Sequence, residues 1–143
     1  MPGIVVAVDG SDHSQAVLEW AMKEAALRQA FLTVLTVHQV AASYWTHNPI
    51  IYSEDRTEQE KSRQAAQDAV TKAASRLGHE VPASVTVRAV SGIAAQEIIH
   101  ASGDTDLVVV GSRGGGGFPG LRMGSVSTQG VHHAACPVVV VRS

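Results

Sequence analysis

The chain is organised around one glycine-rich segment, Val108-Val-Val-Gly111-Ser-Arg-Gly114-Gly-Gly-Gly-Phe-Pro-Gly-Leu-Arg-Met-Gly124-Ser125-Val126-Ser127. The apolar residues at its start predict a buried strand, and the residues after Gly124 predict the beginning of a helix. Seven of the 13 glycines lie between Gly111 and Gly124. Glycine lets bare backbone N–H groups approach a ligand, and a helix N-terminus adds further unpaired amides. The segment therefore predicts an anion site, and phosphate is the first candidate.

Outward from this segment, short apolar runs alternate with longer helical patterns. β-branched runs predict strands over residues 4–8, 31–37, 84–90, 106–110 and 138–141. Apolar residues at helical spacing predict helices over residues 14–29, 54–77, 92–101 and 126–134. Residues 41–53 show no clear period, and we expect them to form a loop rich in aromatic residues.

This alternation predicts an α/β fold in which one parallel sheet carries helices on both faces. At 143 residues the chain has the length of a single domain spanning residues 1–143. In such sheets ligands bind at the carboxyl ends of the strands, near the point where the strand order reverses. Asp9, Val37 and Gly111 all lie at such ends, so we expect them to converge on one site.

Composition restricts the class of protein. A hydrophobic content of 45% with 17% charged residues is typical of a soluble globular protein. A formal net charge of −2 predicts no nucleic-acid partner and no membrane surface. Neither a signal peptide nor a membrane span is expected, and a single cysteine, Cys136, suits a reducing compartment. We therefore expect a cytoplasmic protein in which Cys136 is a packed residue and not a nucleophile.

Two common phosphate motifs do not describe the glycine-rich segment. A P-loop requires Gly-Lys, which occurs nowhere in the chain. The dinucleotide pattern is matched by Gly115, Gly117 and Gly120, but a run of four glycines satisfies many patterns by chance. The match also follows the fourth predicted strand, whereas the dinucleotide motif follows the first.

A third description fits better, namely Gly111-x2-Gly114-x9-Gly124-Ser125, which we call the glycine signature. It resembles the ATP-binding signature of the universal stress protein family in every spacing. The similarity extends over nearly the whole chain, including Val5-Val-Ala-Val-Asp9-Gly-Ser near the start and Cys136-Pro-Val-Val-Val-Val141-Arg at the end.

The resemblance implies a Rossmann-like fold of the adenine nucleotide alpha-hydrolase-like type, with five parallel strands in the order 3-2-1-4-5. It also implies a homodimer and a bound ATP, together with Mg²⁺. By position, the residues bordering the adenosine would be Ala7, Val8, Asp9 and Val37. Those at the ribose and phosphates would be Gly111, Arg113, Gly114, Gly124, Ser125, Val126 and Ser127. Val110, which precedes Gly111, would also belong to the nucleotide-binding set.

Simpler interpretations stand beside these. Asp9 suits a turn or helix cap, Arg113 suits a solvated loop, and Ser125 and Ser127 suit N-caps. The adjacent histidines His132 and His133 do not predict a metal site, because neighbouring residues of a helix point about 100° apart.

Three functions remain open, and no catalytic residue stands out for any of them. The first is an ATP-binding stress-response or signalling protein with an unidentified protein partner. The second is a slow ATPase, which would need a positioned base. The third is a dimerisation module without nucleotide. We expect dimerisation through the strand 138–141, because pairing two such strands would cover an exposed sheet edge.

Overall fold

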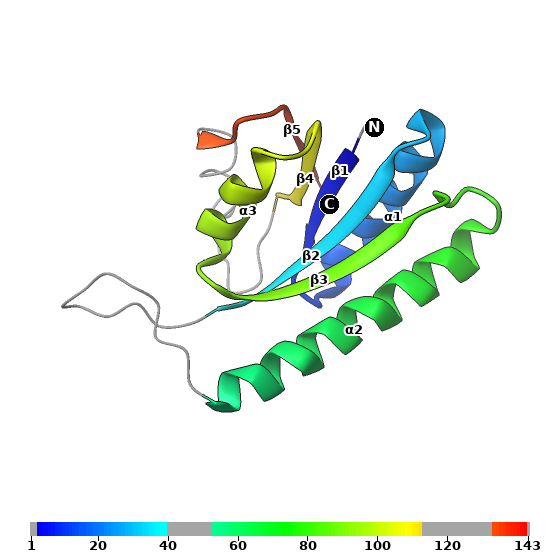
Figure 1. Ribbon diagram of the computed structural model, residues 1–143. Helices are drawn as coiled ribbons and strands as arrows, with labels where there is room; N and C mark the ends of the chain where they lie inside the picture. Colours follow the sequence, from blue (N-terminus) through cyan, green and yellow to red (C-terminus); the bar gives the residue numbers. More distant parts are fainter. Residues whose placement is uncertain (1–2, 40–52, 113–132, 143) are drawn as a thin grey trace.

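The computed structural model describes residues 3–39, 53–112 and 133–142. It contains the five predicted strands and three of the four predicted helices (Figure 1). In chain order these are β1 (Gly3–Val8), α1 (Asp12–Arg28), β2 (Phe31–Gln39), α2 (Ser53–Leu77), β3 (Val85–Gly92), α3 (Ala94–Ser102), β4 (Leu107–Gly111) and β5 (Val138–Val141). The predicted helix 126–134 lies almost entirely outside the described residues, as does the predicted loop 41–53.

All five strands form one parallel sheet in the order β3-β2-β1-β4-β5, which confirms the expected topology. The strand order reverses between β1 and β4. Helices α1 and α2 cover one face, and α3 covers the other (Figure 1). None of the helices in the described ranges is long and apolar enough to span a bilayer.

The core consists of two layers separated by the sheet. Strand side chains alternate between the faces, so Ile4, Val6 and Val8 of β1 pack beneath α1 and α2. Val5 and Ala7 pack toward α3. The β4 residues are buried on both faces, which explains why this strand reads as a continuous apolar run.

Helix α1 is the best buried helix and follows the predicted periodicity. Val17, Leu18, Ala21 and Met22 have at most 1% of their surface exposed. Burial of each larger side chain in this set contributes roughly 1.5–3 kcal/mol. The helix begins at Asp12 and not at residue 14, because Ser11 and not Ser14 is its N-cap.

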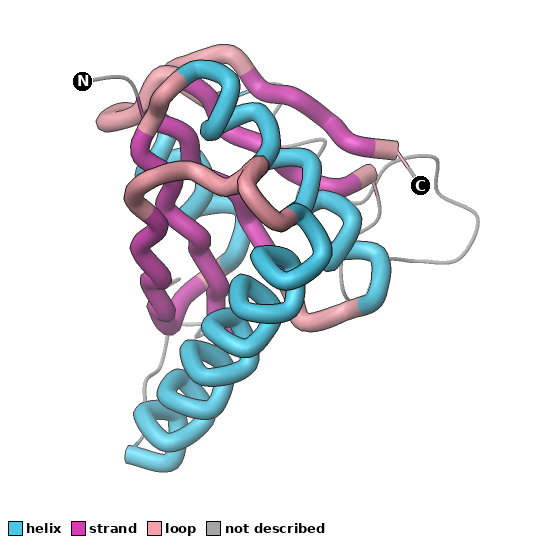
Figure 2. The backbone as a smooth tube through the Cα atoms, turned by 90° about the vertical axis from the view of Figure 1, so that its right-hand side faces the viewer, coloured by secondary structure: helices cyan, strands magenta, loops and turns pink. Residues whose placement is uncertain are grey.

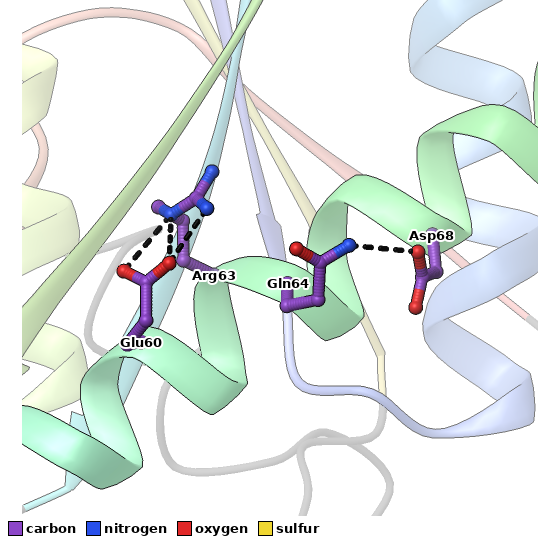
Figure 3. Close-up of polar contacts among 4 residues, drawn as sticks. All are labelled: Glu60, Arg63, Gln64 and Asp68. Carbon is purple, nitrogen blue, oxygen red and sulfur yellow. Dashed lines mark hydrogen bonds and ion pairs between the residues drawn. The ribbon is translucent and has the colours of Figure 1, made fainter.

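Helix α2 is longer, and its N-terminal end extends past the strands (Figure 2). Its buried stripe consists of Ala66, Val70 and Ala73. The exposed side carries local pairs drawn in Figure 3, with Arg63 2.6 Å from Glu60 and Gln64 3.0 Å from Asp68.

The bond from Arg63 lowers the pKa of Glu60, and the same bond raises the pKa of Arg63. Exposed pairs of this kind contribute little to stability. The attachment of α2 to the sheet therefore depends on its alanine-rich stripe.

Strand boundaries differ from prediction where pairing extends beyond the apolar residues. β2 runs to Gln39 and β3 to Gly92, because His38 pairs with Ser91 and Gln39 with Gly92. α3 accordingly begins at Ala94 and not at 92. The ends of β2 and β3 are thus set by each other.

Candidate functional site

The sheet register brings three predicted site residues to one level. Val8 of β1 pairs with Thr36 of β2, and Val6 of β1 pairs with Val109 of β4. Asp9 and Val37 each follow their strand's paired residue by one position, and Gly111 follows Val109 by two. Asp9 directly follows β1 and Gly111 ends β4, so both lie at carboxyl ends of strands beside the point where the strand order reverses. Val37 lies at the level of Asp9 but is not the strand end that the sequence predicts, because β2 continues to Gln39.

The two faces of this edge differ in what they present. Ala7, Val37 and Val110 belong to the layer that packs toward α3. Ala7 and Val37 are half-buried and present a small apolar surface, whereas Val110 has only 2% of its surface exposed. Val8 was grouped with them by sequence, but its side chain lies in the other layer, beneath α1, and is 8% exposed. Only the backbone of Val8 can share a site with Ala7 and Val37.

Asp9 anchors the turn between β1 and α1. Its Oδ1 accepts hydrogen bonds from the Ser11 amide at 2.9 Å and from the Ser11 hydroxyl at 2.6 Å. The hydroxyl oxygen of Ser11 in turn accepts from the Ser14 amide at 3.1 Å, which caps α1. Between them Gly10 takes φ +83°, a conformation that disfavours other residues. Asp9 thus has the turn-capping role that was its simpler interpretation.

Gly111, the first residue of the glycine signature, is closely packed. A Cβ added there would lie 2.7 Å from Nε2 of His13 and 3.1 Å from Cγ2 of Val17. Its φ is not in the left-handed region, where the described glycines are Gly10 and Gly78. Glycine at 111 is therefore required here by the close approach of α1 and not by backbone conformation.

His13 is a residue that sequence reasoning missed. It is the second residue of α1 and is half-buried. One signal was available, since His13 and Val17 are four residues apart and therefore share a helix face. What the sequence did not show is that this face meets the end of β4.

A cavity of about 300 Å³ opens beside the Asp9 turn, between α1 and α2. Its lining mixes apolar residues of α1 and α2 with polar and charged ones of both signs, among them Asp9, Ser11, Thr36, Asp68 and Lys72. Because Thr36 and Val8 face α1 and α2, this cavity lies on the opposite side of the sheet edge from the apolar surface at Ala7 and Val37.

Six predicted site residues lie outside the described residues, namely Arg113, Gly114, Gly124, Ser125, Val126 and Ser127. Within the ranges that the structure describes, no group of three or more His, Cys, Asp or Glu side chains is arranged to hold a metal ion.

Cys136 is half-buried. Burial raises the pKa of its thiol, and the nearby Asp106 carboxylate raises it further. A raised pKa reduces the thiolate fraction, which disfavours the use of Cys136 as a nucleophile.

Comparison with known proteins agrees with this architecture. A universal stress protein from Mycolicibacterium smegmatis is 34% identical over 139 residues, covering 97% of this chain and 47% of that protein. The chain spans about half the length of the curated relatives it matches.

Among solved structures, the universal stress protein UspA from Lactobacillus plantarum aligns with a TM-score of 0.78 at 28% identity, covering 99% of this chain and 97% of the other. The universal stress protein from Archaeoglobus fulgidus in complex with dAMP has the same fold, with a TM-score of 0.65 at 24% identity over 99% of this chain and 98% of that one.

The model of the Universal stress protein family matches residues 2–142. This match covers both the Asp9 turn and the entire glycine signature. The chain therefore belongs to the universal stress protein family.

Proposed function

We propose that this protein binds ATP with Mg²⁺ at the carboxyl edge of β1, β2 and β4, and acts as a nucleotide-dependent regulator in a cytoplasmic stress response. The observation that carries the proposal is the convergence of Asp9, Val37 and Gly111 at the edge where the glycine signature leaves β4. Ligands in open parallel sheets bind at this position.

The two parts of the site suit the two parts of a nucleotide. Ala7 and Val37 offer a small apolar surface, which favours an adenine ring over a free sugar phosphate. The glycine signature supplies backbone amides and two serine hydroxyls for phosphate oxygens. We assign Arg113, Gly114, Gly124, Ser125, Val126 and Ser127 to the phosphate side of the site. The dAMP complex of the Archaeoglobus fulgidus protein supports only the point that this fold accommodates an adenine nucleotide.

Calorimetric titration of the full chain with ATP, ADP, AMP and cyclic AMP, each with and without Mg²⁺, tests the proposal. We expect ATP to bind, and we expect Gly114→Val and Gly124→Val to abolish binding by filling the phosphate path. Gly116→Val is the matched control, since it lies in the same glycine run but at a variable position of the signature. Equal binding by all three variants would remove the signature from the site.

We propose binding without a catalytic role, since no base is assigned near the phosphates. Hydrolysis in which an Asp or Glu activates water would appear as steady phosphate release that disappears in Gly114→Val and Gly124→Val. If contaminating ATPases are excluded, that result would show that the protein is a slow ATPase and that the proposal of binding without catalysis is wrong.

We also propose a homodimer formed through β5. This strand is at an edge of the sheet, and all four of its residues are half-buried valines. The amides of Val108 and Ser112 donate to Pro137 and Val141 of this segment, so the backbone groups of Val138 and Val140 face away from β4.

Val140→Pro tests this interface because it removes an outward donor without removing a bond to β4. We expect sedimentation at micromolar concentration to give a dimer for the native chain and a monomer for the variant. A dimer in both cases would place the interface elsewhere.

A further inference from the structure

We propose that His13 is a positioning residue of the nucleotide site, whose ring sets where the glycine signature begins relative to the Asp9 turn; this inference rests on the nucleotide-binding function proposed above. The contact lies between the first turn of α1 and the last residue of β4. It joins the helix that follows the Asp9 turn, on the adenosine side of the site, to Gly111, where the phosphate side begins.

The geometry leaves room for a hydrogen atom and little else on Gly111. A Cβ at this position would lie 2.7 Å from Nε2 and 3.1 Å from Cδ2 of His13, and 3.1 Å from Cγ2 of Val17. Separations below about 3.4 Å are tighter than ordinary van der Waals contact between carbon atoms. His13 and Val17, one helical turn apart, therefore form a continuous surface against the backbone of Gly111.

The ring of His13 stands on a firmly held element. Val17, directly below it, has no exposed surface, and Leu18 is equally buried. The helix start is held by the Ser11 cap and by the two hydrogen bonds to Asp9. An imidazole also has only two side-chain torsions, so it cannot withdraw from Gly111 as easily as a long flexible side chain.

This contact mechanically links Asp9 to the glycine signature. Asp9 is hydrogen-bonded to Ser11, Ser11 caps the turn that carries His13, and His13 contacts Gly111. Binding groups must be held to within about 0.5 Å of their productive positions. Removal of the ring leaves a gap between the turn and the signature, whereas a methyl group at 111 forces them apart. Either change displaces Gly111, the first residue of the glycine signature, relative to the Asp9 turn.

The test measures ATP affinity of the full chain by calorimetry for His13→Ala, Gly111→Ala and the double variant. We expect each single change to weaken binding by about tenfold or more, which is about 1.4 kcal/mol. Independent effects would multiply to about a hundredfold, but the new methyl group enters the space left by the ring. We therefore expect the ATP affinity of the double variant to be at least as high as that of the single variant with the lower affinity.

Two control variants isolate the contact. His79→Ala removes an exposed histidine in the turn after α2, and Gly92→Ala adds a methyl group at the end of a different strand. Both should bind ATP within about threefold of the native chain, a change of less than 1 kcal/mol. His13→Phe keeps a ring of similar shape, and should retain affinity if the role is steric.

The outcomes separate this inference from the proposed function. If the native chain binds no adenine nucleotide, both fail. If it binds ATP and His13→Ala has an unchanged Kd, only the role of His13 is wrong. Two further results would overturn the role of His13. One is a double variant whose loss of ATP affinity equals the product of the two single losses. The other is a loss of affinity in His13→Phe as large as that in His13→Ala. Thermal unfolding without nucleotide completes the test, because a merely structural role would lower the unfolding temperature and leave the Kd of the folded protein unchanged.

Discussion

Gly92 and Gly111 end two strands of the same sheet, and at each of them a neighbouring side chain lies too close for an added Cβ to fit without movement. At Gly92 the nearest atom is Oε1 of Glu97, at 2.7 Å, and at Gly111 it is Nε2 of His13, also at 2.7 Å. The carboxylate is the far end of a flexible chain that can swing away. The imidazole is short and is supported by Val17, which is fully buried. The two positions should therefore differ in how well they accept a larger residue, although the shortest distances are equal, because only the neighbour of Gly92 can move away.

The largest expected effect follows directly from this difference. Gly111→Ala should lower the free energy of unfolding by about 1–3 kcal/mol, the usual range for overpacking. Gly92→Ala should cost less than about 1 kcal/mol, because all the close atoms, Cγ, Cδ and Oε1 of Glu97, belong to one flexible side chain that can adopt another rotamer. Urea unfolding of both variants measures the two values. A cost at Gly92 equal to that at Gly111 would contradict the distinction between a fixed and a flexible neighbour.

A smaller effect concerns the two helix starts beside these glycines. Ser11 caps α1 through its side chain, whereas Ile93 at the start of α3 makes no side-chain cap. Ser11→Ala should therefore cost about 1 kcal/mol of stability, and it also removes the hydroxyl bond to Asp9 while leaving the bond from the backbone amide of residue 11. Ser75→Ala is the matched control, since its hydroxyl bonds only to Thr71 within α2. If the two alanine variants unfold at the same urea concentration, the Ser11 cap contributes nothing.

The smallest effect is expected on α2, away from both glycines. Because Arg63 lowers the pKa of Glu60 in the folded state, the pair stabilises the fold above the unfolded pKa of glutamate, about 4.3. That contribution disappears as the pH falls through the lower folded pKa. Glu60→Gln should thus differ slightly from the native chain in thermal unfolding at pH 7 and converge with it once the pH has fallen below the lowered pKa of Glu60. A difference in unfolding temperature that grows as the pH falls would show that the pair does not stabilise the fold in the direction assigned here.

Elements whose pattern is local were predictable. The buried face of α1 follows from Leu18, Ala21, Met22 and Ala25, because helical spacing alone places them on one side. The end of β2 was not predictable in the same way. His38 and Gln39 carry no apolar signal, and they are strand residues only because β3 pairs with them.

The candidate site divides along the same line. Strand-to-turn transitions visible in the sequence correctly place Asp9 and Gly111 at strand ends, and the sheet order makes these ends adjacent. The same reasoning placed Val37 at the end of its strand, which is wrong because β2 continues to Gln39. The side-chain direction of Val8 was not anticipated, because grouping by position ignored the alternation along β1.

Periodicity, turn residues and the spacing of the glycine signature specify the class of fold, the order of its elements and the loop that defines the candidate site. These are properties of residues close together in the sequence, so they can be predicted from the sequence alone. The residue that contacts Gly111 cannot be predicted in this way. His13 lies 98 positions earlier in the chain, and only the packing of α1 against β4 brings its ring to that glycine. A contact between distant segments depends on how whole elements pack, which no local pattern encodes.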